Sequence, residues 1–403
     1  MPKKRIYIDY SASTPIDPKV LSAMLPYLKR EYGNPSSVHS FGQKAMAAIE
    51  NARKIVADFL DCLPEEVVFT GGATEANNTA IWGVIKNFQA SIPNDQKKFK
   101  PHVVVSAIEH ESVIELVKRL EKQGIIEATY VGVNKEGMVD PKDVAKTIKE
   151  NTALVSIMYA NSVIGTIQPI KEIGEAIREK SSLTGVSRRF PVIFHTDAVQ
   201  SAQYLPCGVK DLGVDLLTIS AHKLYGPKGV GALYIKKGTV INPLVIGGGQ
   251  ENGARAGTQN VAGIVGFGEA IRTISNPRSA LTNIKIRQLR DKLIKAVLKK
   301  IPGVRLNGSA EKRLPSNVHF CFDGVEGRDV VMLLDQKGAA ISTGSACSER
   351  SQEPDHVLLA LGLSAKEALG GVRITLGKYT KTEEVENTIK YLSQAITQLR
   401  KTA

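Results

Sequence analysis

The sequence predicts an α/β protein with a mainly parallel sheet of seven strands between helices. Two observations predict it. Short apolar runs alternate with amphipathic helical segments between residues 66 and 235, and glycine-rich or polar residues follow these runs. Alternating strands and helices form parallel sheets, because each helix carries the chain back across the sheet. After Gly247-Gly248-Gly249 the pattern changes, which indicates a smaller α+β domain.

The predicted strands are rich in Val, Ile, Leu and Phe, which is typical of strands buried on both faces. Gly71-Gly72 ends the first strand, and apolar residues at helical spacing predict helices over residues 74–88, 111–123 and 170–180. The seven predicted strands occupy residues 66–70, 102–106, 128–131, 153–158, 191–194, 216–219 and 230–235.

The later part of the chain begins with a long helical region over residues 260–300, rich in Leu, Ile, Lys and Arg. We therefore expect a large domain over residues 16–260 and a small domain made of residues 1–15 and 261–403. Within the small domain we expect apolar runs at residues 317–322, 339–342 and 372–376, and helices over residues 327–337 and 381–401.

The formal net charge of the 403 residues is +13. The lysines and arginines are scattered, so the charge favours anionic ligands over direct binding of nucleic acid. No apolar stretch is long enough to span a bilayer, and no apolar core of a signal peptide follows the basic residues Lys3-Lys4-Arg5. We therefore expect a cytoplasmic protein without a membrane segment.

Four cysteines are present, and no CxxC or Cys/His cluster predicts a metal site. Cys62, Cys207 and Cys321 lie in or near apolar segments, where packing is their expected role. Cys347 differs, because small polar residues surround it between positions 342 and 348. This composition is typical of a mobile loop with an accessible thiol.

Lys223 is the residue that indicates a cofactor. It follows an apolar run, beside His222 and before Gly226 and Gly229. A lysine in such a setting can lose its proton and form a Schiff base with an aldehyde. Asp197 also follows an apolar run and would pair with a protonated pyridine nitrogen, although such an aspartate could instead cap a helix. Together they indicate pyridoxal 5′-phosphate, whose ring acts as an electron sink.

Other polar residues also follow the predicted strands, where open α/β sheets bind ligands. Thr74, at a helix start after two glycines, would bind a phosphate with the backbone amides, or would only cap the helix. Ser220 and His222 would add phosphate donors. His110 would stack on the cofactor ring or move protons, unless it is a core histidine. Asn161-Ser162 and Gln200 also follow strands.

Arg373 lies inside the apolar run Val372-Arg373-Ile374-Thr375. An arginine in such a run needs an anionic partner to offset its desolvation. A substrate carboxylate suits its paired donors, and a structural ion pair is the alternative.

These features together resemble the cysteine desulfurases of the NifS/IscS-like branch of the class V aminotransferases, which are fold-type-I pyridoxal-phosphate enzymes. The resemblance covers nearly the whole chain. The matching motifs are Tyr7-Ile8-Asp9-Tyr10-Ser11-Ala12-Ser13-Thr14-Pro15, Gly33-Asn34-Pro35-Ser36-Ser37, Thr70-Gly71-Gly72-Ala73-Thr74-Glu75-Ala76-Asn77, Glu109-His110, His195-Thr196-Asp197-Ala198-Val199-Gln200-Ser201, Ala221-His222-Lys223-Leu224-Tyr225-Gly226-Pro227-Lys228-Gly229 and Gly344-Ser345-Ala346-Cys347.

The resemblance implies a role for each site residue. Lys223 would form the Schiff base, Asp197 would hold the ring nitrogen, and His110 would stack on the ring. Gln200 would bond the phenolic oxygen, and Arg373 would bind the substrate carboxylate. Cys347 would be the nucleophile that becomes a persulfide. The phosphate would be held by Ala73, Thr74, Ser220 and His222, and by Thr258 from the other subunit of a homodimer.

The implied reaction removes sulfur from L-cysteine and leaves L-alanine and a persulfide on Cys347. The sulfur would pass to an acceptor protein, either an iron–sulfur scaffold or a tRNA-thiolation enzyme. With a scaffold, Cys347 would also be able to ligate an iron–sulfur cluster.

One departure from the family leaves other activities open. Relatives usually carry Asn-Asn-Glu-Ile-Gly where this chain has Asn161-Ser162-Val163-Ile164-Gly165. The second Asn would contact the cofactor and the substrate carboxylate. Ser162 is shorter and lacks an amide, so either Asn161 would compensate or Arg373 would act more alone. A selenocysteine lyase, a small-amino-acid aminotransferase and a non-catalytic sulfur-relay subunit therefore stay as alternatives.

Overall fold

A seven-stranded sheet is the central element of the structure, a computed structural model that describes residues 5–92, 99–183, 191–344 and 353–402. The spatial order is β2-β8-β7-β6-β5-β3-β4. β8 pairs antiparallel with both β2 and β7, so it alone runs against the other six strands. The predicted mainly parallel sheet is confirmed. The strands are β2 Val67–Thr70, β3 His102–Ser106, β4 Glu127–Val131, β5 Thr152–Ser156, β6 Ile193–Asp197, β7 Leu216–Ser220 and β8 Gly231–Ile235.

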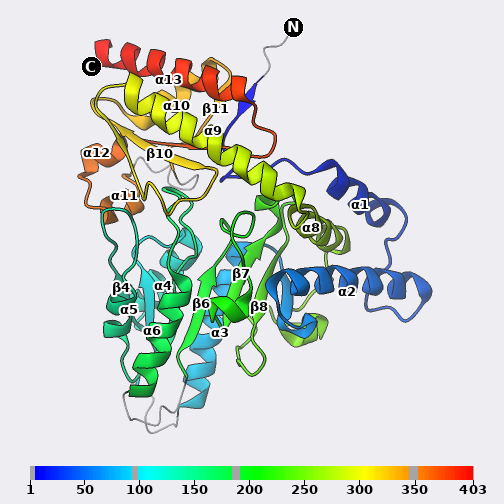
Figure 1. Ribbon diagram of the computed structural model, residues 1–403. Coiled ribbons are helices and arrows are strands. Elements are labelled where there is room, and N and C mark those ends of the chain that lie inside the picture. The colour runs from blue at the N-terminus through cyan, green and yellow to red at the C-terminus, as the bar shows by residue number, and fades with distance from the viewer. Residues whose placement is uncertain (1–4, 93–98, 184–190, 345–352, 403) are drawn as a thin grey trace.

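Helices cover both faces of this sheet (Figure 1). α3 Ala73–Ser91 and α4 Glu111–Lys122 pack on one face, against strand residues such as Val103 and Leu216. Helices on the other face pack against the residue that follows each of these in its strand, Val104 in β3 and Leu217 in β7. Successive strand residues point to opposite faces, so the strands of a sheet covered on both sides carry apolar residues on both faces. The second group comprises α1 Pro18–Lys29, α2 Ser40–Leu60, α5 Pro141–Thr147, α6 Ile170–Leu183, α7 Val209–Leu212 and α8 Val261–Ile274.

A three-stranded antiparallel sheet lies above the large sheet in Figure 1 and has a hydrophobic core of its own. Ile6 and Ile8 join this second core, because β1 pairs in parallel with β11. The N-terminal segment therefore packs with the C-terminal part of the chain. The elements of this region are β1 Ile6–Tyr7, α9 Arg278–Lys300, β9 Val304–Leu306, β10 Asn317–Phe322, α10 Gly327–Gln336, β11 Ala339–Ala340, α11 His356–Ala360, α12 Ala365–Leu369, β12 Gly371–Thr375 and α13 Thr382–Thr402.

The helical region predicted over residues 260–300 is two helices, α8 and α9. Pro277 precedes α9 and has no N–H to continue a helix, which explains the break after Ile274. α8 packs on the large sheet through Ile264 and Phe267, whereas α9 packs in the second core. We therefore propose that the domain boundary lies between α8 and α9 instead of at residue 260.

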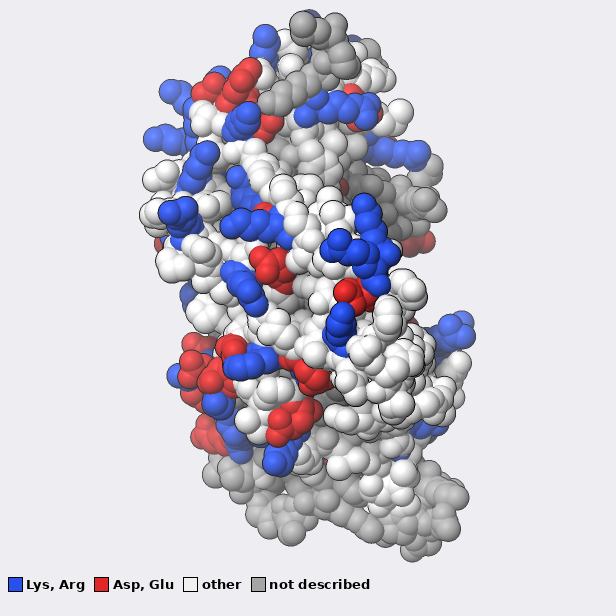
Figure 2. Space-filling model, turned by 90° about the vertical axis from the view of Figure 1, so that its right-hand side faces the viewer, with Lys and Arg blue, Asp and Glu red and all other residues white. Residues whose placement is uncertain are grey.

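Basic side chains are spread over the surface. Figure 2 shows Lys and Arg scattered among uncharged residues, with Asp and Glu between them. The described residues on this face therefore form no single dense basic patch. In the described part of the chain, no helix combines the length and the apolar character that a membrane crossing requires.

A buried ion pair fixes the loop before α8. Arg53 of α2 donates from Nη1 and Nη2 to the two carboxylate oxygens of Glu251, at 2.8 and 2.9 Å. Burial raises the pKa of Glu251, but the hydrogen bonds and charge of Arg53 outweigh it, so the pKa lies below its ordinary value. Glu251 and Asn252 have φ of 49° and 54°, a conformation that non-glycine residues rarely adopt. The ion pair therefore holds a strained backbone in place.

Two buried histidines should make the stability of the fold depend on pH. Burial lowers the pKa of His195 to about 4 and that of His319 to about 3. An unfolded histidine binds a proton near pH 6.5, so below that pH the unfolded state binds more protons than the folded state. We expect the free energy of unfolding to fall as the pH decreases from about 6.5 to about 4, by up to about 1.4 kcal/mol per pH unit for each histidine.

Urea unfolding at a series of pH values between about 5 and 7.5 would measure this slope. His195→Gln removes one titrating group and should make the slope shallower. His39→Gln, at an exposed helix cap, should leave the slope as it is. An unchanged slope in His195→Gln would contradict the prediction.

Candidate active site

A pocket of about 440 Å³ lies at the carboxyl ends of the large sheet's parallel strands, where the small sheet meets them. Five strand ends contribute to it, as the sequence predicted, and Arg373 reaches it from β12 of the small sheet. Its lining residues are Ser11, Ala12, Ser13, Gly71, Gly72, Ala73, Thr74, Glu75, His110, Met158, Ala160, Ser162, Asp197, Val199, Gln200, Ser220, His222, Lys223, Lys228, Gly229 and Arg373.

A larger hollow of about 1080 Å³ lies at the opposite edge of the sheet, between the start of β6 and the end of β8. None of the predicted site residues that the structure describes lines it. Ser181 and Pro191 do, and these flank the undescribed residues 184–190. The smaller pocket, which the predicted site residues line, is therefore the candidate active site.

The turn after β7 places Lys223 in the pocket. Its Nζ donates hydrogen bonds to the backbone carbonyls of Ser11 and of Ala12, the second at 2.9 Å. Thr14 fixes the turn from the same N-terminal segment. Its N–H donates to the His222 carbonyl at 3.0 Å, and its Oγ1 accepts from the Tyr225 N–H at 2.9 Å. Tyr225 has a φ of 65°, so these contacts hold a left-handed residue two positions after the lysine.

Asp197 is held by a hydrogen-bonded chain that ends at His110. The amide nitrogen of Asn77 donates to Asp197 Oδ2 and to Ser112 Oγ, both at 2.8 Å. Ser112 in turn contacts His110 Nδ1 with its hydroxyl, at 2.9 Å, and with its backbone N–H, at 3.1 Å. The other oxygen of Asp197 accepts from the Val199 N–H at 2.9 Å. Asn77 thus orients the aspartate and the histidine together.

The same chain determines the protonation of His110. A ring nitrogen that accepts a backbone N–H carries no proton, so the proton of a neutral His110 is on Nε2. Burial lowers the pKa of His110, and the nearby charge of Lys223 adds to this effect against that of Asp197. His110 is therefore neutral near pH 7.

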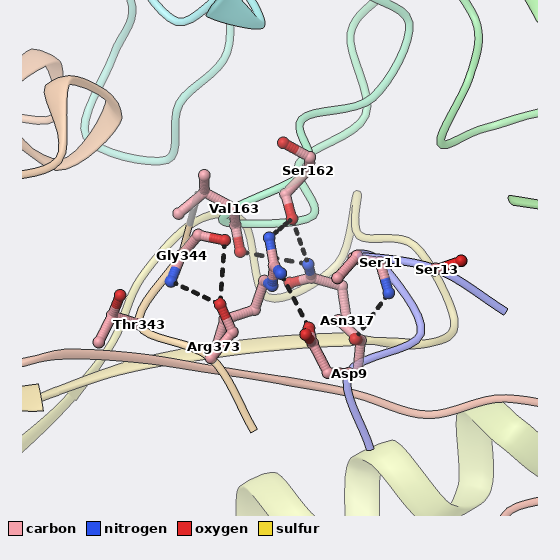
Figure 3. A network of polar contacts seen from close by, with 12 residues as sticks. Asp9, Ser11, Ser13, Ser162, Val163, Asn317, Thr343, Gly344 and Arg373 are labelled. Carbon is pink, nitrogen blue, oxygen red and sulfur yellow. Dashed lines mark hydrogen bonds and ion pairs between the residues drawn. The ribbon is translucent and has the colours of Figure 1, made fainter. Parts of the chain in front are cut away.

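Arg373 lies between an acidic side chain and a carbonyl (Figure 3). Its Nη2 pairs with Asp9 Oδ1 at 2.9 Å, and its Nη1 donates to the Ser162 carbonyl at 3.3 Å. Its buried Nε has no hydrogen-bond partner among the described residues. A guanidinium carries five N–H donors, so the structural ion pair with Asp9 leaves donors for a second carboxylate.

Comparison with known proteins identifies the family. The chain matches the model described as aminotransferase class-V over residues 6–388. It is 46% identical over 398 residues to the cysteine desulfurase IscS of Dictyoglomus turgidum, covering 99% of this chain and 96% of the relative. The chain belongs to the cysteine desulfurases of the class-V aminotransferase family.

Further relatives of this family agree. The cysteine desulfurase IscS of Methanosarcina thermophila is 43% identical over 397 residues, which cover 98% of this chain and 93% of the relative. A solved NifS-like protein superimposes with a TM-score of 0.88 at 35% identity, over 98% of this chain and 100% of that one. A structure titled SspA in complex with cysteine gives a TM-score of 0.78 at 36% identity, over 93% and 100%. The expected fold-type-I architecture is confirmed.

Cysteine desulfurases depend on pyridoxal 5′-phosphate, and the pocket residues fit this cofactor. The buried hydroxyl of Ser220 has no hydrogen-bond partner within the described ranges, and it lies at the pocket. Gly72 caps α3 without a side-chain hydrogen bond, so the first N–H groups of the helix are available to an anion. Together with Ala73, Thr74 and His222, these groups would hold the phosphate. Lys223 and Asp197 would then meet the aldehyde and the ring nitrogen.

The remaining predicted residues are placed differently. Gln200 lines the pocket and donates to the Ser11 carbonyl at 3.1 Å. Ser162 lines it as well. Asn161 does not. Its amide nitrogen donates to the Ile108 carbonyl at 2.9 Å, and its oxygen accepts two backbone N–H groups of its own loop. We therefore correct the expectation that Asn161 compensates for Ser162, because its amide shapes the loop.

Thr258 does not line the pocket, and Cys347 is not among the residues that the structure describes. Thr258 is exposed, after the loop fixed by the Arg53–Glu251 ion pair. Its contact with a second subunit stays a prediction. Cys347 falls in residues 345–352, which the structure does not describe.

The sequence analysis assigned no role to Asp9, Asn77 or Ser112. A signal for Asn77 was present. It follows Thr74 by three positions, and residues three apart share one face of a helix. Asp9 and Ser112 have no comparable signal, since each meets its partner only through the tertiary fold.

Asn77→Ala should loosen the cofactor. The substitution leaves Asp197 Oδ2 and the Ser112 hydroxyl without their shared donor, and unpaired buried polar groups cost roughly 1–3 kcal/mol. We expect cofactor to dissociate about tenfold faster, measured from its absorbance during dialysis. The matched control is Asn78→Ala, since among the described residues Asn78 donates to the Ser112 carbonyl alone, at 2.8 Å. Equal losses in both variants would argue against a specific role of Asn77.

Proposed function

We propose that this protein is a cysteine desulfurase that converts L-cysteine to L-alanine and leaves a persulfide on Cys347. The convergence of Lys223, Asp197 and Arg373 on one pocket, in a chain of this family, carries the proposal. The three residues match a cofactor aldehyde, a ring nitrogen and an amino-acid carboxylate. A non-catalytic relay subunit would need none of them.

Bound pyridoxal phosphate supplies an electron sink for negative charge that develops at the substrate α-carbon. The chain supplies the rest. Arg373 would hold the α-carboxylate with the donors that Asp9 and Ser162 leave available. Lys223 Nζ would carry the α-proton, from a position set by the Ser11 and Ala12 carbonyls. Neutral His110 would cover the ring without adding a positive charge.

The sulfur-transfer step needs a thiolate, which we assign to Cys347. Its sulfur attacks the sulfur of the substrate, so that an S–S bond forms as the C–S bond breaks. The electron pair of the broken bond remains with the carbon fragment, which takes up protons to become alanine. The step needs no added oxidant. Transfer of the outer sulfur to a thiol on an acceptor restores Cys347.

Cys347→Ala should separate this step from cofactor binding. We expect the variant to keep the absorbance of the bound cofactor and to lose sulfide release from L-cysteine by at least about 100-fold, because no thiol remains to accept the sulfur. Cys62→Ala, which removes a thiol of the half-buried Cys62, is the matched control and should retain activity. Sulfide release that persists in Cys347→Ala would remove Cys347 from the mechanism.

Ser162 is the observation that favours a second candidate. Its side chain at the pocket is smaller than the Asn of relatives, and the structure brings no amide from Asn161 in its place. A selenocysteine lyase or a small-amino-acid aminotransferase would tolerate this change. Comparing turnover of cysteine, selenocysteine, and alanine with a keto acid separates the three, and robust transamination would replace the desulfurase proposal.

We further propose a homodimer. Several large apolar side chains are exposed around α1 and α2 and before α8, including Tyr32 at 77%, Val38 at 89% and Ile246 at 86%. Exposed apolar residues grouped in this way are typical of an association surface. The strained loop held by Arg53 would then present Thr258 to the partner's phosphate.

Ile246→Asp should weaken this dimer, because a carboxylate would be buried on association. Light scattering after gel filtration would show a shift toward the monomer at micromolar concentration. The control is Leu281→Asp, at a site on α9 that is 69% exposed and outside this surface. A parent protein that is already monomeric would refute the dimer.

The persulfide sulfur would pass to an acceptor protein for iron–sulfur cluster assembly, with tRNA thiolation as the second route. The cytoplasmic location and cluster ligation by Cys347 stay predictions. An assay with purified scaffold or thiolation enzyme and radiolabelled cysteine would distinguish the two acceptors.

A further inference from the structure

Beside the pocket, Arg373 already binds a carboxylate of the protein itself. Arg373 lines the pocket, and its Nη2 contacts Asp9 Oδ1 at 2.9 Å. Figure 3 shows Asp9 on one side of the guanidinium and Ser162 on the other. The side chain of Arg373 is 3% exposed and that of Asp9 is 17% exposed, so water screens this pair only weakly. A ligand carboxylate that reaches Arg373 therefore meets the charge of Asp9 there.

The backbone fixes Asp9 beside β12, the strand that carries Arg373. The Thr375 N–H donates to the Ile8 carbonyl at 2.8 Å, and Asp9 and Thr375 form a parallel bridge. The Asp9 carbonyl accepts from the Tyr7 hydroxyl at 2.9 Å. The main chain therefore holds Asp9 close to Arg373, in addition to the attraction between the two charges.

Asp9 neutralises the charge of Arg373 before any ligand binds. Within the described ranges, no second carboxylate pairs with this guanidinium. A substrate carboxylate on the remaining donors would place a second negative charge beside a single positive one. Because a guanidinium is only a few ångströms wide, the two carboxylates would lie close together, and like charges repel strongly where water is partly excluded.

Asp9 also orients the guanidinium, which would favour ligand binding. It is not alone in this role, because the Ser162 carbonyl accepts from Nη1 at 3.3 Å and the backbone of Arg373 lies inside β12. Loss of the Asp9 charge would therefore leave Arg373 in place. The repulsion between the two carboxylates then determines the sign of the effect, and Asp9 weakens carboxylate binding.

Weak binding of the carboxylate suits the proposed reaction. L-Cysteine and L-alanine carry the same α-carboxylate and α-amino group, so Arg373 would hold substrate and product through the same contact. Binding energy common to both lowers KM without accelerating the chemical step, and it slows the release of the product. A carboxylate site of limited strength therefore favours turnover.

We propose that Asp9 is a positioning residue that shares the Arg373 guanidinium with the substrate carboxylate and weakens its binding, so that the amino-acid product leaves. The inference rests on the proposed function, because it takes Arg373 as the carboxylate site. Asp9 acts through Arg373 and takes no part in sulfur transfer. Removing its charge should strengthen the binding of L-alanine, whereas loss of a purely structural ion pair would weaken that binding or leave it unchanged.

Asp9→Asn in the cofactor-loaded enzyme tests the proposal, because the amide keeps the shape of the side chain and removes its charge. We expect the Kd of L-alanine, titrated through the absorbance of the bound cofactor, to fall about tenfold. The KM for L-cysteine should fall with it while kcat stays the same or decreases, since the added binding is common to substrate and product. Ethylamine, which is L-alanine without its carboxylate, should bind as it does to the parent.

Asp215→Asn is the matched control. Asp215 also pairs with a cation, Lys236 at 3.1 Å, and accepts a backbone N–H, that of Phe194 at 3.0 Å. It lines the hollow at the opposite edge of the large sheet, so the Kd of L-alanine should stay at the parental value. Asp9→Ser removes the charge with a smaller side chain and should lower the Kd as Asp9→Asn does.

Thermal unfolding provides a readout that needs no turnover. Without ligand, Asp9→Asn should melt at a lower temperature than the parent, because Arg373 is left buried without a charged partner. Saturating L-alanine supplies that partner, so it should raise the melting temperature of Asp9→Asn by more than it raises that of the parent.

A Kd for L-alanine that is unchanged or higher in both Asp9 variants would overturn the proposal. An equal gain in the binding of ethylamine would also overturn it, since the effect would then not involve the carboxylate. Failure of the proposed function is distinguishable. It would appear as sulfide release that persists in Cys347→Ala, or as L-alanine that binds equally well to the parent and to Arg373→Leu, and neither result depends on the Asp9 variants.

Discussion

The hydrogen bonds of residues 9–17 hold the two halves of the site together. The Ser11 N–H donates to Thr375 Oγ1 of the small sheet at 2.9 Å, while the Ser11 carbonyl accepts from Lys223 after the large sheet. Asp9 pairs with Arg373, and Thr14 holds the lysine turn. Arg373 and Lys223 come from different sheets with separate cores, and this short segment contacts both. The position of Arg373, which would bind the substrate carboxylate, relative to the amine of Lys223 therefore depends on this segment.

The charges of the site are arranged to tolerate burial. Arg373 is paired with Asp9, and Arg255 pairs with Glu75 at 2.9 Å beside the phosphate cradle. A buried charge without a partner would be costly. Burial lowers the pKa of His110 and of His319, and an N–H group donates to Nδ1 of each ring, so both histidines are neutral near pH 7. The site therefore offers hydrogen-bond donors to an anionic ligand, and its two arginines are already paired with carboxylates.

The strands of the large sheet and the polar or glycine-rich residues at their carboxyl ends were predictable, because each is a pattern of residues that are neighbours in the sequence. The sequence did not predict α1 or α2. α2 buries Ala45, Ala52 and Ala57 beside larger apolar residues, and an alanine marks a buried face less clearly because alanines are also common at exposed helix positions. Their burial comes from packing against α8, which is distant in sequence.

The residues of the site likewise fall into those that the sequence predicted and those that it did not. Lys223, Asp197, His110 and Arg373 were found because their chemistry is unusual in an apolar run or at a strand end. Asp9 and Ser112 were not identified, since polar residues in loops and at helix starts are common. Asn161 was expected at the pocket, but its neighbour Ser162 lines the pocket instead. The two residues are adjacent in one loop, and no sequence signal shows which of them faces the pocket and which one bonds to the backbone of the loop.

The hydroxyl of Ser220, which has no hydrogen-bond partner in the part of the chain that the structure describes and is buried beside the uncapped start of α3, has a consequence for the life of the protein in a cell. An anion bound there satisfies groups that the protein alone leaves unsatisfied, so it favours the folded state by mass action. The abundance of the chain should then follow the supply of vitamin B6. Cells short of the vitamin would lose the protein to proteolysis as well as losing its activity.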